Sequence, residues 1–132
     1  MEKQRLISSY DEINDTFVGK IEGKNGYCAD YNISDGIFLA IDENKVPSSI
    51  FVDKASGVFN IPKMILESAN VKIALDCDAA FLNFNLFIEG LKICSLKSEN
   101  RYGMPEFNFC LDSNYWNCYF FLFFSYPTLN FK

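Results

Sequence analysis

The sequence predicts a mainly β fold: an antiparallel two-sheet sandwich or barrel of about nine strands with one short helix. Three observations favour this class. Apolar stretches of strand length recur along the 132 residues and are separated by Gly, Asn, Asp and Ser. Over 71–77, apolar and other residues alternate with period two. With 49% hydrophobic and 22% charged residues, the composition is globular, and the length suits a single domain over 1–132.

The first half contains four expected strands, and chain neighbours are expected to pair as hairpins across turns rich in Gly, Asn and Asp. The four strands cover 16–22, 27–33, 37–41 and 48–54. A short helix over 61–69 follows, with Asn60 as its N-cap and Pro62 in its first turn. No other helix is indicated.

The second half contains five expected strands, which we interpret as an antiparallel meander. They cover 71–77, 81–88, 91–96, 107–111 and 115–126. Glu89-Gly90 predicts a tight hairpin, because glycine readily adopts positive φ. The seven glycines of the chain stand singly, at expected turns, so no phosphate-binding loop is predicted.

The absence of histidine from the sequence excludes several kinds of site. No Ser-His-Asp or Cys-His arrangement can form, and there is no imidazole ligand. The five cysteines include no Cys-x-x-Cys pair, which argues against a disulfide framework and a zinc site and favours reduced, buried thiols. We therefore expect no cofactor and no enzyme activity.

Asp76 and Asp78 are the carboxylates that come closest to a metal-binding pattern. They flank Cys77 at the end of a predicted strand, where both side chains would point the same way and could share a divalent cation. In the structural interpretation they only solvate the strand end and its turn. We expect no metal, and a metal-dependent enzyme that uses these two residues is the second alternative function.

The formal charge of −5 is concentrated in the first half. Residues 1–60 carry ten acidic and six basic side chains, and 61–132 carry seven and six. Without a cluster of Lys or Arg, direct binding of nucleic acid is not expected. A protein partner with a basic surface fits better, and the expected contact residues are Asp11, Glu12, Asp15, Asp30, Asp35, Asp42 and Glu43. For the first three, a structural role in the turn before the strand 16–22 is the alternative.

The expected last strand, 115–126, is apolar and aromatic on both faces. It is either a central core strand or part of a subunit interface, in which case the protein would be a homodimer. The residues that we assign to self-association or to a pocket are Trp116, Tyr119 and Phe120. This apolar run is too short to span a bilayer as a helix, and the start of the sequence lacks the apolar core of a signal peptide. The prediction is a cytoplasmic protein without membrane contact.

Part of the first half resembles a known family. The resemblance covers 10–56 and rests on Tyr10-Asp11 followed by Asp15, on Asp35-Gly36, and on the segment Phe51 to Ser56. These motifs are similar to those of a bacterial family of small β-rich domains of unknown function. The usual aliphatic-Tyr-aliphatic pattern is replaced by Thr16-Phe17-Val18. The resemblance implies a bacterial or phage source, and it implies no activity.

We expect a non-enzymatic acidic binding protein that inhibits or neutralises a protein partner, such as a nuclease or another nucleic-acid-binding effector. Bacterial toxin-immunity proteins and phage inhibitors of host defence, including anti-CRISPR proteins, share this size and charge. The first alternative is a protein that sequesters a small molecule or nucleotide between aromatic side chains.

Overall fold

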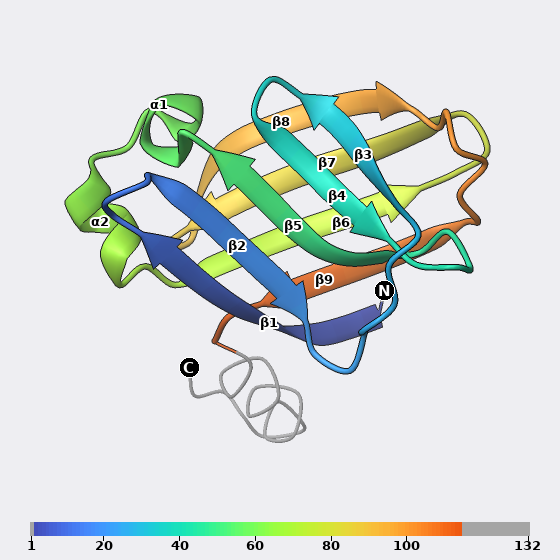
Figure 1. The fold of residues 1–132 in the computed structure, drawn as a ribbon, viewed down its shortest axis with the longest axis horizontal. Coiled ribbons are helices and arrows are strands. Elements are labelled where there is room, and N and C mark those ends of the chain that lie inside the picture. The colour runs from blue at the N-terminus through green and yellow to red at the C-terminus, as the bar shows by residue number, and fades with distance from the viewer. Residues whose placement is uncertain (1, 115–132) are drawn as a thin grey trace, which may run out of the picture.

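The computed structural model describes residues 2–114, a part of the chain that forms nine strands and two short helices (Figure 1). The strands are β1 (Glu2–Asp11), β2 (Thr16–Ile21), β3 (Ala29–Ser34), β4 (Ile37–Ile41), β5 (Pro47–Asp53), β6 (Val71–Cys77), β7 (Phe81–Ile88), β8 (Leu91–Glu99) and β9 (Phe107–Asp112). The helices are α1 (Ala55–Phe59) and α2 (Lys63–Glu67). The predicted strand 115–126 lies outside the described residues.

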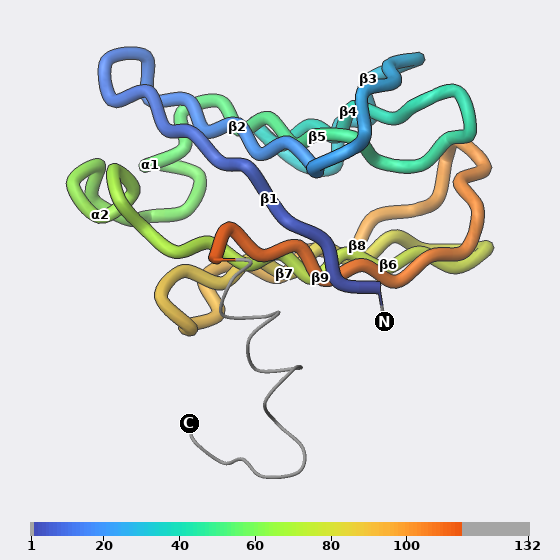
Figure 2. Tube along the Cα trace, turned by 90° about the horizontal axis from the view of Figure 1, so that it is seen from below, coloured from blue at the N-terminus to red at the C-terminus, as the bar shows by residue number. Residues whose placement is uncertain are grey.

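The strands form one mixed sheet in the order β3-β4-β5-β2-β1-β9-β6-β7-β8, which is nearly closed into a barrel. The pairs are antiparallel except for β1 and β9, which run parallel. Viewed from below, the strands divide into two layers, with β2 to β5 in one and β6 to β9 in the other (Figure 2). The prediction of a β-rich sandwich or barrel is confirmed.

Each layer is a Greek key and not a simple meander. In the second layer, β6, β7 and β8 follow one another as hairpins, but β9 returns to pair with β6. In the first layer, β3, β4 and β5 are consecutive hairpins, and β2 pairs with β5. The predicted pairing of 107–111 within a meander and of 16–22 with 27–33 was therefore wrong. Long-range partners decide these pairings, and local turn signals do not reveal them.

β1 joins the two layers, and the sequence did not predict it. Its residues 6–11 pair antiparallel with β2, and its residues 2–5 pair parallel with β9. In Figure 2 it crosses diagonally from one layer to the other. Leu6 is the one side chain of β1 that is fully buried. Because a strand is recognised in a sequence by its buried apolar face, a strand held mainly by its backbone leaves little signal.

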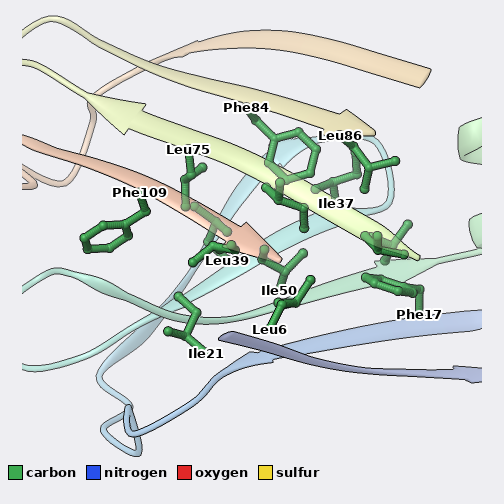
Figure 3. Packing of buried hydrophobic residues seen from close by; sticks show 14 of the residues in the cluster. Leu6, Phe17, Ile21, Ile37, Leu39, Ile50, Leu75, Phe84, Leu86 and Phe109 are labelled. Carbon is green, nitrogen blue, oxygen red and sulfur yellow. The ribbon is translucent and has the colours of Figure 1, made fainter. Parts of the chain in front are cut away.

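The core lies between the two layers and receives side chains from both (Figure 3). Ile21, Leu39 and Ile50 of the first layer and Leu75 and Phe84 of the second are almost completely buried. The strands that contribute them alternate buried and more accessible positions, as β6 does throughout. The period-two pattern predicted over 71–77 is confirmed.

The two ends of the sheet, β3 and β8, meet through side chains. The buried hydroxyl of Tyr31 lies 3.3 Å from Oγ of Ser98. The guanidinium group of Arg101 donates to the carbonyl of Asn32 at 2.8 Å, and the hydroxyl of Tyr102 donates to the carbonyl of Asp30 at 3.2 Å. Side chains of β8 and of the turn after it therefore hold the two ends of the sheet together, where no backbone pairing joins them.

The connections confirm the predicted hairpin turn and the predicted helix, and they differ from the prediction in two respects. Glu89 and Gly90, between β7 and β8, both have positive φ, as the predicted tight hairpin requires. α2 lies within the predicted helix 61–69, whereas α1 was not predicted. Asn60 does not cap α2; it ends α1 with φ of 56°, a left-handed conformation that asparagine tolerates well. In residues 2–114 there is no helix with the length and apolar character needed to cross a membrane.

Gly19 lies in the middle of β2 and not at a turn, where the sequence analysis placed it. A Cβ atom at this position would lie 2.9 Å from Cδ1 of Leu6, the buried side chain of β1. The glycine therefore leaves space for the one core side chain of the strand that joins the layers.

We predict that Gly19→Ala destabilises the protein by about 1–3 kcal/mol, because the new methyl group must displace a buried leucine. Chemical denaturation measures the free energy of unfolding. The matched control is Gly57→Ala in α1, where the new Cβ meets no neighbour within 4 Å. There we expect a gain of up to about 1 kcal/mol from helix propensity. Equal stability of the two variants would contradict the role assigned to Gly19.

Candidate functional site

The negative charge of the protein belongs to the first layer and the loops at its ends. Residues 11–53 carry nine carboxylates and three lysines, a net charge of −6, whereas the complete chain has −5. This segment contains β2 to β5. The two layers of the molecule therefore differ in net charge, and the first layer is the acidic one.

The strand registers place the seven acidic residues of the predicted partner site at two opposite ends of the first layer. Thr16 pairs with Asp53 and Ile37 pairs with Val52, so the loops before β2 and β4 lie at the same end, close to α1. This end holds Asp11, Glu12, Asp15 and Asp35. The other end holds Asp30, Asp42 and Glu43, because Ala29 pairs with Ile41. A five-residue strand such as β4 spans about 16 Å, so the seven carboxylates do not form one cluster.

Two of these carboxylates hold turns together. Oδ1 of Asp11 accepts hydrogen bonds from the backbone N–H groups of Ile13 and Asn14, at 3.0 and 3.2 Å. Its Oδ2 accepts one from the side-chain amide of Asn14 at 2.7 Å, and the bonds from Asn14 lower the pKa of Asp11. Oδ1 of Asp42 accepts from the N–H groups of Asn44 and Val46, at 2.8 and 3.0 Å. For Asp11, the structural alternative considered in the sequence analysis describes what its carboxylate does.

Asp15 connects three elements. Its Oδ1 accepts a hydrogen bond of 2.6 Å from the Tyr10 hydroxyl and one of 3.0 Å from the Ser56 N–H. Its Oδ2 accepts the Ser56 hydroxyl at 2.7 Å. Burial raises the pKa of Asp15, but the bonds from Tyr10 and Ser56 outweigh that effect and lower it below its usual value. The carboxylate thereby joins β1, the loop before β2 and the first turn of α1, and we name this set of contacts the Asp15 clasp.

The other four acidic residues are exposed. Glu12 and Asp35 lie at the end near α1, and Asp30 and Glu43 lie at the opposite end. Asp30 accepts a hydrogen bond of 3.2 Å from the exposed Tyr27 hydroxyl, and its charge raises the pKa of that hydroxyl. These four carboxylates point into solvent, where they can contribute to a contact with another molecule.

The sequence analysis did not identify the outward surface of the first layer. Val18, Phe51 and Phe38 are direct neighbours across β2, β5 and β4 and form what we call the apolar row. Val18 and Phe51 are 39% and 41% exposed. Their strands also carry buried side chains on the inner face, such as Phe17 and Ile50. In the sequence, apolar residues at successive positions in these three strands indicate that both faces carry apolar side chains. Only the register shows that the outward ones lie together.

Asp76 and Asp78 are engaged in local contacts. Asp76 accepts a hydrogen bond of 2.9 Å from the side-chain amide of Asn83 on β7. Asp78 accepts two of 2.8 Å from the N–H groups of Ala80 and Phe81, which lower its pKa. Between them, burial raises the pKa of the Cys77 thiol to about 11, which keeps it protonated and a poor metal ligand. Within residues 2–114, no three His, Cys, Asp or Glu side chains gather closely enough to hold a metal ion.

The residues assigned to self-association or to a pocket, Trp116, Tyr119 and Phe120, lie outside the described part of the chain. Their assignment stays a prediction.

We predict that Asp15→Asn lowers the free energy of unfolding at pH 7 by about 1–3 kcal/mol, because the clasp loses a charged acceptor. Asparagine tolerates the left-handed conformation of residue 15, whose φ is 55°, so the backbone is not strained. Since the pKa of Asp15 is lowered on folding, its contribution is present above the unfolded value of about 3.9 and is lost as the pH falls through the folded value.

Denaturation curves at pH 7 and at pH 3 test this prediction. The difference between the wild-type protein and Asp15→Asn should shrink at the lower pH. Asp35→Asn, the same substitution at an exposed turn residue, is the control and should have little effect at either pH. A loss of stability that is the same at both pH values would contradict the role assigned to the Asp15 charge.

The chain was compared with protein families, curated proteins and solved structures. No family model matches the chain, and no match is found among the curated proteins or among the solved structures.

Proposed function

We propose that the protein is a non-enzymatic acidic binding protein that neutralises a protein partner with a basic surface. The observation that carries the proposal is the net charge of −6 on residues 11–53, which build one layer of the molecule. Proteins that bind nucleic acid present basic surfaces to the phosphates. An acidic layer competes for such a surface, and its charge both accelerates encounter and selects the partner.

The partner class that fits is a nuclease or another nucleic-acid-binding effector. The protein would act in the cytoplasm of a bacterium, or of the host cell if a phage encodes it, in the manner of toxin-immunity or anti-CRISPR proteins. The carboxylates of Asp76 and Asp78 are occupied by local hydrogen bonds, which favours binding over metal-dependent catalysis.

We predict that the immobilised full-length protein retains a protein partner at low salt from a lysate of the cells in which it is made, and releases it at high salt. The captured partner should bind nucleic acid in a gel-shift assay, and added protein should abolish the shift. A captured partner whose nucleic-acid binding is unaffected by the protein would contradict the proposed neutralisation. Failure to retain any protein at low salt would contradict the proposal as a whole.

A matched pair of charge variants makes this test specific. The triple variant Glu12→Gln, Asp35→Asn and Glu43→Gln removes three exposed carboxylates of the acidic layer. The control, Glu67→Gln, Glu99→Gln and Glu106→Gln, changes the net charge equally but outside residues 11–53. We expect association with the partner to slow several-fold in the first variant and to stay near the wild-type rate in the second. Equal effects of the two variants would show that the association rate depends on the net charge and not on where the carboxylates lie, which would contradict a contact through the acidic layer.

A further inference from the structure

The apolar row on the outward surface of the first layer carries a more specific inference. Val18 lies directly opposite Phe51, which lies directly opposite Phe38, and the two phenylalanine rings are 6.3 Å apart. Ile7 on β1, which is 47% exposed, lies in the adjacent row, directly opposite Lys20. An antiparallel sheet with one face on the core normally presents polar residues to water on the other. Adjacent exposed apolar side chains on rigid strands are typical of a binding surface.

Charged residues flank the apolar row on both sides. On one side, Asp11, Thr16 and Asp53 form the next row across β1, β2 and β5. On the other side, the next row contains Lys20 on β2 and Asp30 on β3. These two rows carry three carboxylates and one ammonium group, and the guanidinium group of Arg101 donates to the carbonyl of Asn32, which lies opposite Phe38. An apolar centre with a charged rim is the usual arrangement of a protein-binding surface.

The excess of negative charge around the apolar row decides which kind of molecule can bind there. A second copy of the chain, packed face to face, would bring the carboxylate-rich rims together, and like charges across an interface cost affinity. Nucleic acids and anionic lipid surfaces are repelled for the same reason. A protein segment with apolar side chains on one face and Lys or Arg beside them can pack on the apolar row and pair its positive charges with the flanking carboxylates.

We propose that the apolar row and its rim are the docking site for a basic amphipathic segment of the partner protein. The inference rests on the proposed function, since it locates the contact that the acidic layer makes. Apolar side chains of the segment would cover Val18, Phe51 and Phe38, and its basic side chains would face Asp11 and Asp53.

Other exposed apolar residues fit this role less well. Ile13 and Met64 are 92% and 81% exposed, but Ile13 lies in the loop before β2 and Met64 in the five-residue helix α2. The two segments lie close together, since Lys63 donates to the carbonyl of Glu12, but neither residue is on a strand of the sheet. The apolar row lies on strands that are each paired on both sides, which keeps its side chains in a fixed arrangement and reduces the entropy lost on binding.

A defined probe tests the proposal without knowledge of the partner. The probe is a synthetic helical peptide with leucine on one face and lysine on the other, and the matched peptide carries glutamate in place of lysine. Titrated into the full-length, isotope-labelled protein, the lysine peptide should shift the amide signals of Val18, Phe38 and Phe51 and bind more weakly as salt is added. The glutamate peptide should not bind.

Three variants locate the contact. Phe51→Ser should weaken binding of the lysine peptide by about tenfold, as the loss of a central aromatic anchor does in protein interfaces. Asp53→Lys, an exposed charge reversal, should weaken the lysine peptide and allow the glutamate peptide to bind. Phe87→Ser removes a half-buried phenylalanine from the outward face of the other layer and should bind like the wild-type protein. Thermal melting confirms that each variant is folded, and Val18→Ser replaces Phe51→Ser if that variant is not.

The results separate this inference from the proposed function. Shifts confined to β6, β7 or β8, or equal binding of the two peptides, would overturn the docking site. The same holds if the natural partner, captured as described above, binds Phe51→Ser and Asp53→Lys as it binds the wild-type protein; the proposed function would then stand with another contact. If no partner is captured at all, the result contradicts the proposed function, whatever the peptides show.

Discussion

The backbone pairing of β1 with both β2 and β9 is the constraint on which the rest of the fold depends. Two Greek keys, each built from four strands, meet at this one strand, which is antiparallel to one neighbour and parallel to the other. Without it, β2 and β9 would each expose an unpaired edge. Leu6 anchors the crossing in the core, and Gly19 on β2 leaves the space that Leu6 occupies. A strand with little apolar character is thus held by hydrogen bonds, by Leu6 in the core and by Tyr10 packed against the core.

This construction explains why the first layer can use both of its faces. β2 lies between β1 and β5, and β5 lies between β2 and β4, so each strand is paired on both sides. Phe17, Ile50 and Val52 fill the inner face, while Val18 and Phe51 remain on the outer one. The Asp15 clasp fixes the loop before β2 against α1 at one end of this layer. The outward surface is therefore preorganised, and a partner would not have to order it on binding.

The acidic residues of the first layer have two kinds of role. Asp11, Asp15 and Asp42 hold loops through hydrogen bonds, and for Asp11 and Asp15 these bonds lower the pKa, so both carboxylates stay ionised near neutral pH. Glu12, Asp30, Asp35 and Glu43 are exposed. Both groups contribute to the negative potential of the layer, because that potential depends on charge and not on whether a carboxylate is free to move. Structural carboxylates thus support the proposed binding through their charge, even though hydrogen bonds hold them in loops.

Local patterns let the sequence by itself determine the β class, the strand at 71–77, the turn at Glu89-Gly90 and the acidic character of residues 11–53. Each depends on residues close together in the chain, where side-chain alternation, backbone preference and charge can be read directly. The tertiary structure alone decided that β1 is a strand, that β9 pairs with β6, and that Val18, Phe51 and Phe38 form one row. These features depend on the register between distant strands, and long-range packing, which no short segment encodes, determines that register.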